Sequence, residues 1–367
     1  MTNKRKPDLF ILLAVLFLLI LGIIMVTSAS FPKALSASNG ANPFAFGQKQ
    51  LVFALLSVGV LLVMANFDYH HFRKFTLLFA FLAPILLVLV LFFGEDIHGA
   101  KRWFNFRFFN IQPSEFAKLA IIFVLAHYLA EIGPEVRSFS IGVLVPLCYL
   151  GLICGLIMME PDLGTTIVIF TIFFTMLFAA GVRIDHLLFL GLSALGIGTV
   201  LIIKEQYRLQ RLLSFIDPMK DPKGSGWQII QSLMALGSGG IFGLGLGRSR
   251  QKFFYLPEPH TDYIFSIIGE ELGLLGTFLV LITFLFLAWR GYKIALSATD
   301  SYGNLLAVGI TSGVVFQALI NIGVVTSTIP ATGITLPLLS YGGSSLIITM
   351  MSLGILMNIS REAEEKN

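Results

Sequence analysis

Long apolar blocks separated by short polar intervals dominate the pattern of this chain. A helix that spans the hydrocarbon core of a bilayer needs about 20 predominantly apolar residues. Because the backbone must satisfy its own hydrogen bonds in lipid, blocks of that length predict helices. The pattern therefore predicts ten spanning helices, at about residues 8–28, 48–66, 75–93, 115–131, 140–159, 163–181, 185–203, 262–289, 304–326 and 337–358.

Composition supports the same class of protein. The 367 residues are 56% hydrophobic and 13% charged, with a mean hydropathy of +0.85, whereas a soluble domain carries about 25% charged residues. Too few charges remain to coat a soluble globule of this size. We predict an all-α, polytopic integral membrane protein whose residues 1–367 form one domain. The net charge of +4 is modest and suggests no nucleic-acid partner.

Two local features have simple interpretations. The first apolar block, Leu9 to Val26, is long enough to span, whereas the apolar region of a signal peptide usually has about 7–15 residues. We therefore expect a retained helix, although Ser28-Ala-Ser30 weakly resembles a cleavage site. Cys148 and Cys154 lie in one apolar block and are expected to be packing residues, not a disulfide or a metal pair.

The positive-inside rule gives an orientation. With the N-terminus inside, the cytoplasmic side holds eleven Lys and Arg residues: Lys4, Arg5, Lys6, Arg73, Lys74, Arg137, Arg183, Arg290, Lys293, Arg361 and Lys366. The outer side, without its long polar interval, holds six: Lys33, Lys49, Lys101, Arg102, Arg107 and Lys118. Both termini are therefore expected inside. The cluster around Arg102 breaks the rule, which suggests that these residues have a task outside.

The long polar interval, residues 204–261, is predicted to be an extracellular loop. Within it, Trp227 to Leu236 has apolar residues at helical spacing and predicts an amphipathic surface helix. The glycine-rich run from Gly237 to Gly247 predicts either flexible backbone or close approach of two chain segments.

Asp262 ends this loop, where the polar interval meets an apolar helix, together with the neighbouring His260. An ionisable group at such a boundary is a candidate functional residue, and Asp is equally favoured as a helix N-cap. Glu270 lies about 80° around the same helix from Asp262, so it could line the same cavity. Glu271 points the opposite way. An interhelical hydrogen bond is the favoured role of both glutamates.

Three other motifs lie on the predicted outer side. In Gln112-Pro-Ser-Glu-Phe-Ala-Lys118, Pro113 suits a first helical turn, Ser114 suits a cap, and Glu115 and Lys118 can pair or hold a polar cavity open. Asp162 either caps a helix or orients a cation or sugar beside Asp262.

Ser340-Tyr-Gly-Gly-Ser-Ser345 opens the last span, either for close helix packing or for substrate contact. The loop cations Arg208, Arg211, Arg248, Arg250 and Lys252 suit lipid headgroups or a diphosphate.

Together these motifs resemble one family. Gly99-Ala-Lys-Arg-Trp103, Gln112-Pro-Ser-Glu115, Pro161-Asp-Leu-Gly164, Tyr255-Leu-Pro-Glu-Pro259 with Thr261-Asp262, and Thr335-Leu-Pro-Leu-Leu-Ser-Tyr-Gly-Gly-Ser-Ser345 are similar, in order, to motifs of the SEDS family (shape, elongation, division, sporulation). Gly224 to Gln231 and Gln251 to Pro259 look closer to the FtsW and SpoVE members than to RodA.

The resemblance implies a peptidoglycan glycosyltransferase that polymerises lipid II at the outer face of the bacterial cytoplasmic membrane, with the division septum as its expected location. It implies Asp262 as the catalytic residue and possible metal ligand, with Mg²⁺ or Mn²⁺ but no organic cofactor. It also implies a class B penicillin-binding protein and other division proteins as partners, beside membrane lipids. Candidate substrate-binding residues are Arg102, Gln112, Glu115, Lys118, Asp162, Arg208, Arg211, Arg248, Lys252, His260, Ser340, Gly342 and Gly343.

One position departs from the family pattern. Glu160 stands where the family usually has Gln, which adds a carboxylate beside Asp162. Two other functions stay open at this point. A lipid II flippase or transporter would also use many helices and buried acids, although no internal repeat is visible, and a non-catalytic division scaffold would not need Asp262.

Overall fold

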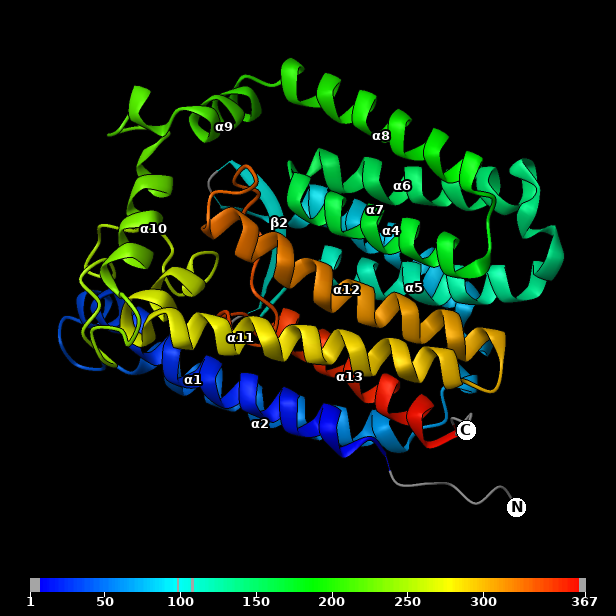
Figure 1. The fold of residues 1–367 in the computed structure, drawn as a ribbon, viewed down its shortest axis with the longest axis horizontal. Helices are drawn as coiled ribbons and strands as arrows, with labels where there is room; N and C mark the ends of the chain where they lie inside the picture. Colours follow the sequence, from blue (N-terminus) through cyan, green and yellow to red (C-terminus); the bar gives the residue numbers. More distant parts are fainter. Residues whose placement is uncertain (1–6, 98, 107–108, 363–367) are drawn as a thin grey trace.

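The computed structural model describes residues 7–97, 99–106 and 109–362. Within them, ten helices are long and apolar enough to cross a membrane, as predicted. They are α1 (Leu9–Ala37), α2 (Ala45–Asn66), α4 (Thr76–Phe93), α5 (Pro113–Ile132), α6 (Val145–Met159), α7 (Leu163–Ala180), α8 (Ile184–Lys204), α11 (Ile264–Ser297), α12 (Ser301–Val325) and α13 (Gly343–Glu362). The expected class, a multi-span helical membrane protein, is confirmed (Figure 1).

Three helix ends differ from the predicted ones. Helix α1 continues through Ser28-Ala-Ser30 to Ala37, and α11 continues to Ser297 with a break at Gly273. Helix α13 begins at Gly343, not near 337, because residues 330–342 form turns and extended chain. The charges predicted at Lys4, Arg5, Lys6, Arg107 and Lys366 lie outside the described residues.

Short elements connect the spans. They are α3 (His70–Lys74), the strands β1 (Glu95–Ile97), β2 (Ala100–Phe106) and β3 (Phe109–Ile111), a 3-10 turn (Gly133–Arg137), a π turn (Ser140–Leu144), α9 (Gln206–Ile216), a second 3-10 turn (Pro218–Lys220) and α10 (Trp227–Ser238). The strands form an antiparallel sheet in the order β1-β2-β3, with Asn105 opposite Asn110. Neither the sheet nor α9 was predicted. Helix α10 confirms the predicted helix and packs against α11.

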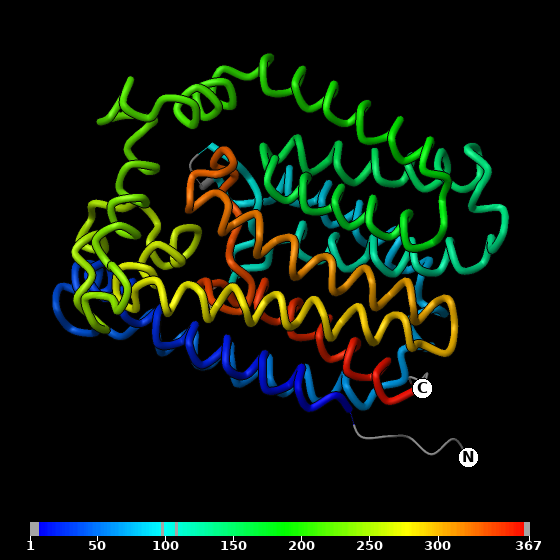
Figure 2. The backbone as a smooth tube through the Cα atoms, viewed as in Figure 1, coloured from blue at the N-terminus to red at the C-terminus, as the bar shows by residue number. Residues whose placement is uncertain are grey.

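Helix α12 lies at the centre of the bundle and contacts α5, α7 and α11 (Figure 2). In its most apolar stretch 72% of the residues are buried, against 11% in α8, which runs along the edge of the bundle. The start of α1 and the end of α13 lie at one end of the bundle, whereas α9 and α10 lie at the opposite end (Figure 1). Cys148 and Cys154 form no disulfide; Cys154 packs against the core as expected, whereas the Cys148 side chain is exposed, so its interpretation as a packing residue is wrong.

The first and last spans close the bundle together. Helix α13 packs along α2 so closely that a Cβ on Gly354 would lie 2.6 Å from the Leu61 carbonyl oxygen. At the end of the bundle that holds both chain ends, the Asp8 N–H donates to Ser360 Oγ at 3.0 Å. The Arg290 guanidinium of α11 pairs with the Asp8 carboxylate. These contacts tie α1, α11 and α13 together.

Candidate functional site

A cavity of about 1970 Å³ lies toward the end of the bundle that carries α9 and α10. Its walls come from α5, α7, α9 and α12, from strand β2, and from the segments 257–262 and 329–343. Small-molecule pockets usually have about 300–1,000 Å³. The cavity therefore suits a large or extended ligand.

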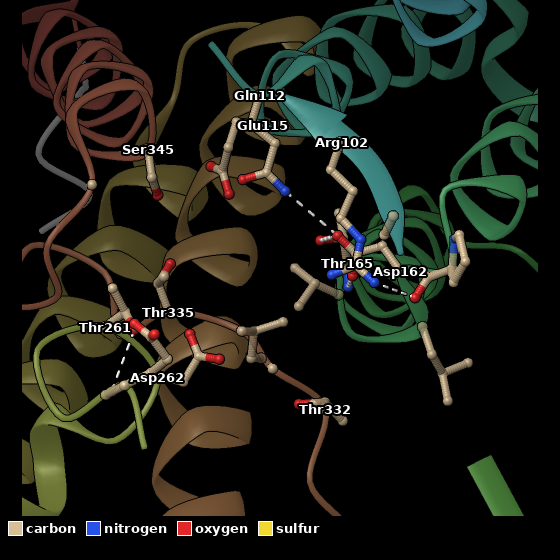
Figure 3. Close-up of a pocket in the computed structure, with 18 of the residues that line it drawn as sticks. Arg102, Gln112, Glu115, Asp162, Thr165, Thr261, Asp262, Thr332, Thr335 and Ser345 are labelled. Carbon is tan, nitrogen blue, oxygen red and sulfur yellow. Dashed lines mark hydrogen bonds between the residues drawn. The ribbon is translucent and has the colours of Figure 1, made fainter. Parts of the chain in front are cut away.

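Eleven of the fourteen residues proposed from the sequence line this cavity. They are Arg102, Gln112, Glu115, Lys118, Asp162, Arg208, Arg211, His260, Asp262, Gly342 and Gly343. Segments far apart in the sequence therefore converge on one space, as Figure 3 shows for Arg102, Gln112, Glu115, Asp162 and Asp262.

The structure does not place the other three in the cavity lining. Lys252 is 4% exposed, and its ammonium pairs with Glu271 at 2.8 Å. Arg248 is exposed on the loop beyond the cavity wall. Ser340 lies behind the wall, where its hydroxyl donates to the Thr261 carbonyl at 2.6 Å. The first two belong to a separate loop, and Ser340 supports the main chain beside Asp262.

Asp262 faces the cavity with a carboxylate that accepts no hydrogen bond from the described residues (Figure 3). The interpretation of Asp262 as a helix cap is wrong, because α11 has Tyr263 at its N-cap and no side-chain cap bond. The pKa of Asp262 is raised to about 6, mainly by burial, with the nearby Glu258 adding to the shift and Arg211 opposing it. A free carboxylate with that pKa can accept a proton near neutral pH.

Hydrogen bonds to three consecutive carbonyls hold the main chain at Asp262. The Asp262 carbonyl accepts from Asn321 Nδ2 at 2.7 Å, and the same amide donates to the Ile334 carbonyl at 2.7 Å. The two preceding carbonyls accept from the Ser340 hydroxyl at 2.6 Å and the Tyr341 N–H at 2.9 Å. Helix α12 and the 334–341 segment therefore set the position of the carboxylate.

Three arginines bring positive charge to the cavity. Arg211 of α9 donates to the Ala331 carbonyl at 3.1 Å. A Cβ on Gly333 would lie 3.6 Å from Asp262 Oδ2 and 4.0 Å from Arg211 Nη1, so this glycine leaves room beside both groups. Arg208 donates to the Leu201 carbonyl at 3.1 Å, which connects α9 to the end of α8.

Arg102 of β2 reaches the turn before α7. Its Nε donates to the Glu160 carbonyl at 2.7 Å, and its Nη2 donates to the Pro161 carbonyl at 2.5 Å. The unpredicted sheet therefore carries a cation to the cavity wall. Asp162 follows this turn and caps α7, with Oδ1 accepting the Thr165 N–H at 3.0 Å, which confirms its interpretation as a cap.

The predicted pair of Glu115 and Lys118 is present, with the Lys118 ammonium 2.9 Å from the carboxylate. The ammonium also donates to Gln317 Oε1 of α12 at 2.6 Å. The expectation of a Ser114 cap is wrong, because Gln112 is the N-cap residue of α5 and Pro113 occupies the first turn. The buried Ser114 hydroxyl has no hydrogen-bond partner among the described residues.

Sequence reasoning did not single out Gln317 and Asn321. Both lie on α12, four residues apart, so they share one face of a membrane-spanning helix. Amide side chains inside a span usually face protein or a polar cavity. Two amide residues four positions apart in an apolar block were therefore the sequence signal that could have identified Gln317 and Asn321.

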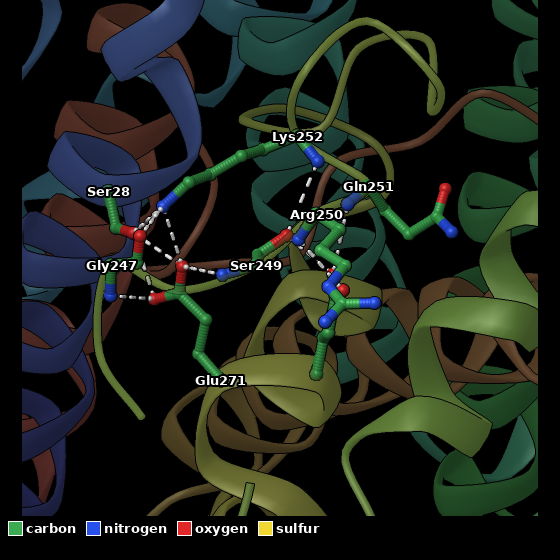
Figure 4. Close-up of polar contacts among 8 residues, drawn as sticks. Ser28, Gly247, Ser249, Arg250, Gln251, Lys252 and Glu271 are labelled. Atoms are coloured by element: carbon green, nitrogen blue, oxygen red, sulfur yellow. Dashed lines mark hydrogen bonds and ion pairs between the residues drawn. The ribbon is translucent and has the colours of Figure 1, made fainter. Parts of the chain in front are cut away.

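Glu270 does not line the cavity, and neither does Glu271. Both carboxylates instead hold the loop of residues 247–252 (Figure 4). The predicted interhelical hydrogen bond is present for Glu271, which accepts from the Ser28 hydroxyl of α1 at 2.7 Å. For Glu270 that prediction is wrong, because its carboxylate accepts from residues 249–251 of the loop.

The cavity contains carboxylates that fit a divalent cation in part. Among the described residues, the single cluster of three close metal-ligand side chains is Asp68, His70 and Glu362, at the other end of the bundle. In the cavity, Asp262 offers a carboxylate without protein partners. Mg²⁺ commonly binds one or two carboxylates together with substrate phosphates. The residues present therefore suit a cation that arrives with a diphosphate.

A family model described as "Cell cycle protein", covering FtsW, RodA and SpoVE, matches residues 8–365. The chain belongs to this family. The match spans all ten membrane helices, the converging cavity residues and the Asp262 segment.

Relatives of this FtsW/RodA/SpoVE protein align over nearly its whole length. Stage V sporulation protein E of Bacillus subtilis is 48% identical over 362 residues, covering 98% of each chain. A probable peptidoglycan glycosyltransferase FtsW of Trichlorobacter lovleyi is 42% identical, covering 97% of this chain and 95% of the relative.

Two solved structures share the fold. A chain from a study of structural coordination of polymerization and crosslinking by a peptidoglycan synthase complex is 27% identical, with a TM-score of 0.79, covering 98% of this chain and 99% of the other. The rod shape determining protein RodA of Thermus thermophilus is also 27% identical, with a TM-score of 0.72, covering 98% of each chain.

Proposed function

We propose that this protein is a peptidoglycan glycosyltransferase that polymerises lipid II, with Asp262 as its general base. The observation that carries the proposal is the unpartnered Asp262 carboxylate in a large cavity lined by arginines, in a chain of this family. The relative from Trichlorobacter lovleyi is named a probable peptidoglycan glycosyltransferase FtsW.

The reaction needs one inverting displacement. Asp262 takes the proton from the 4-hydroxyl of the acceptor sugar, whose oxygen attacks the anomeric carbon of the lipid-linked donor. The new C–O bond forms as the bond from that carbon to the diphosphate breaks, and undecaprenyl diphosphate leaves with the bonding electrons. The α-linked donor thus gives a β-linked product. The leaving group departs as an anion, so no protein acid is required.

Positive charge must meet the negative charge that develops on the diphosphate. Arg211 lies near Asp262, and Arg208 and Arg102 line other parts of the same cavity. Forked guanidinium donors suit phosphate oxygens. A divalent cation, Mg²⁺ or Mn²⁺, would neutralise the same charge when bound with the diphosphate, with Asp262 or Asp162 as protein ligands.

The apolar part of the cavity suits the prenyl chain. Ile167 and Val168 of α7, Ile202 of α8, and Phe316 and Ile320 of α12 line the same space. A prenyl chain bound along these helices would keep contact with hydrocarbon while the sugars reach Asp262. This explains why a sugar polymerase is built as a membrane bundle.

Orientation, location and partners are further parts of the proposal. The Lys and Arg bias favours both termini inside, which puts Asp262 at the outer face of the cytoplasmic membrane. The septum is the proposed location. A class B penicillin-binding protein is the proposed partner, since a structural neighbour belongs to a peptidoglycan synthase complex.

The decisive experiment is polymerisation of purified lipid II in detergent, with and without the partner. We expect glycan strands from the wild type and none from Asp262→Asn, while the variant keeps its elution profile and helical content. Normal strands from Asp262→Asn would exclude Asp262 as the base. If the wild type forms no glycan strands with or without the partner, a flippase or a scaffold would be favoured. Transport across a membrane cannot occur in detergent, so strands formed there would report polymerisation alone.

A further inference from the structure

Helix α11 is broken at Gly273, and the glycine-rich loop fills the break. Gly273 has φ 68° and ψ −165°, which interrupts the helical hydrogen bonds on both sides. The N–H groups of Leu244 and Gly245 donate to the carbonyls of Glu270 and Glu271, at 2.9 and 3.0 Å. The loop therefore replaces the partners that a continuous helix would have supplied.

The other side of the break is satisfied in the same way. The N–H of Leu274 donates to the Gly240 carbonyl at 2.9 Å, and the N–H of Leu275 donates to the Ile241 carbonyl at 3.2 Å. Unpaired backbone groups are costly at membrane depth, so this pairing makes irregular backbone tolerable there.

Glycines allow the two backbones to approach. A Cβ on Gly243 would lie 2.2 Å from the Glu271 carbonyl oxygen, and one on Gly239 would lie 1.9 Å from that of Gly269. The sequence left open whether these glycines give flexibility or close approach. The structure shows close approach, at Gly243 with a positive φ of 80°.

Two buried carboxylates fix the rest of the loop (Figure 4). Glu271 accepts from the N–H groups of Gly247 and Ser249, at 3.0 and 3.2 Å, and from the Ser28 hydroxyl of α1 at 2.7 Å. Glu270 accepts the Arg250 N–H at 2.9 Å. These hydrogen bonds fix the loop against α11, and the Ser28 bond also connects α11 to α1.

The glycine-rich loop exposes apolar side chains on the surface of the protein. Ile241 is 58% exposed, Phe242 79% and Leu246 56%. They adjoin the exposed Leu274 and Leu275 of α11, because the Ile241 carbonyl bonds directly to the Leu275 N–H. Exposed apolar side chains of the loop therefore lie beside exposed apolar side chains of the membrane-spanning helix.

The length of α11 fixes the depth of this surface. From Leu274 to Trp289 the helix has sixteen consecutive uncharged residues, followed by Arg290. At about 1.5 Å per residue this stretch is about 24 Å long, shorter than a hydrocarbon core of about 30 Å. If the hydrocarbon begins at Arg290, it extends past Leu274, whose neighbour Leu275 bonds to the Ile241 carbonyl of the loop. Phe242 follows Ile241 directly in the chain.

We propose that residues 239–247 form a hydrophobic wedge that inserts into the leaflet on the side of the cavity, with phospholipid as its occupant. Arg248 and Arg250, which follow the wedge and are exposed, suit the phosphates of anionic headgroups above it. The wedge fixes how deep the cavity end of the bundle sits in the bilayer, and it does not depend on the proposed activity.

The test uses spin labels on a cysteine-free chain (Cys148→Ser, Cys154→Ser) in liposomes of phosphatidylcholine and phosphatidylglycerol at about 3:1. Single cysteines replace Phe242, Leu285 as a lipid-facing reference within α11, and Lys223 as a water-exposed reference on the loop. Collisions with oxygen report lipid, and collisions with a nickel chelate report water. We expect the label at 242 to be at least about fivefold less accessible to nickel than that at 223, and closer to that at 285.

Equal nickel accessibility at 242 and 223 would overturn the wedge. Protection at 242 that appears only after a penicillin-binding protein is added would also overturn it, in favour of a protein interface. Gly243→Ala provides a second test, since its Cβ cannot fit against Glu271. We expect that change to raise nickel accessibility at 242, and unchanged accessibility would contradict the role of the α11 break.

Discussion

The side-chain amide nitrogen of Asn321, on α12, donates hydrogen bonds to two carbonyl oxygens, those of Asp262 and Ile334, each at 2.7 Å. Asn321 thereby connects the segment that carries Asp262, the proposed base, to the segment that contains Ile334. The Asn321 side chain does not line the cavity. It is a positioning residue.

Replacing Asn321 by Ala should lower kcat at least about tenfold, equivalent to about 1.4 kcal/mol, with a smaller change in KM. The Asp262 main chain would lose a donor while the substrate-binding arginines stay in place. Steady-state polymerisation of lipid II measures both constants. Asn304→Ala is the matched control, since it removes a similar bond to the Ala295 carbonyl at the opposite end of α12. Equal losses in both variants would indicate a general loss of stability.

Activity should depend on pH through Asp262. The base must be ionised to accept a proton, and burial raises the pKa of Asp262 to about 6. We therefore expect kcat/KM to rise with pH through about 6 and then level off. A profile measured between pH 4.5 and 8 checks this. A limb centred near pH 4 would contradict a base in this environment.

Stability should show the opposite dependence. A carboxyl whose pKa is raised on folding stabilises the fold at low pH and loses that contribution as pH rises from about 4 through about 6. Asp262→Asn should thus increase the free energy of unfolding by about 2 kcal/mol at pH 8, and by little at pH 4. Thermal unfolding at both pH values measures it, with the exposed Asp217→Asn as control. A pH-independent effect would argue against a buried charge.

Glu160 should behave as a neutral acid at pH 7. Its side chain is fully buried, neither oxygen has a partner among the described residues, and burial raises its pKa to about 8, with Asp162 adding to the shift and Arg102 opposing it. Glu160→Gln should thus leave activity at pH 7 within about twofold of wild type, since a neutral carboxyl and an amide have nearly the same shape and charge.

The same substitution should remove a loss of stability between about pH 4.5 and pH 8. The wild type should lose stability as pH rises from about 4.5 through about 8 and level off above that, whereas Glu160→Gln should not. Unfolding temperatures between pH 4.5 and 9 check this, with the exposed Glu205→Gln as control. A tenfold loss of activity at pH 7 would mean that Glu160 acts as a charged group.

Lys118→Ala should destabilise the protein by about 3 kcal/mol, because it leaves the Glu115 carboxylate buried without its counter-charge. The double variant Glu115→Gln/Lys118→Met should recover most of that loss. Thermal unfolding distinguishes the two, with the exposed Lys223→Ala as reference. If Lys118→Ala is stable but inactive, the ammonium acts on substrate; full activity with lower stability would make the pair structural.

The sequence allowed the spans, the α10 helix and the Asp162 cap to be predicted because each depends on neighbouring residues. Block length identifies a span, and cap chemistry acts within one turn. Asp262 was identified by its place at a boundary and by the family motif. The cap role expected for it was wrong, because the helix begins one residue later than expected, with Tyr263 at the N-cap.

Features that depend on distant segments escaped prediction. Lys252 resembled a phosphate-binding cation, but its charge is neutralised by Glu271, nineteen residues further along the chain. Arg102 was recognised as unusual for its side of the membrane, but the sheet that carries it was missed, because its strands are as short as three residues. Such short strands give too little alternation to be detected.

The closure of the bundle by α13 bears on how the chain matures during synthesis. Helices α1 and α2 emerge first, yet the face of α2 around Leu61 is covered by α13, and Asp8 meets Ser360 near the far end of the chain. Helices α1 and α2 therefore lie in the bilayer without their α13 contacts until translation is nearly finished. Nascent chains that stop short of residue 343 should remain open to quality-control proteases, whatever the state of the middle of the protein.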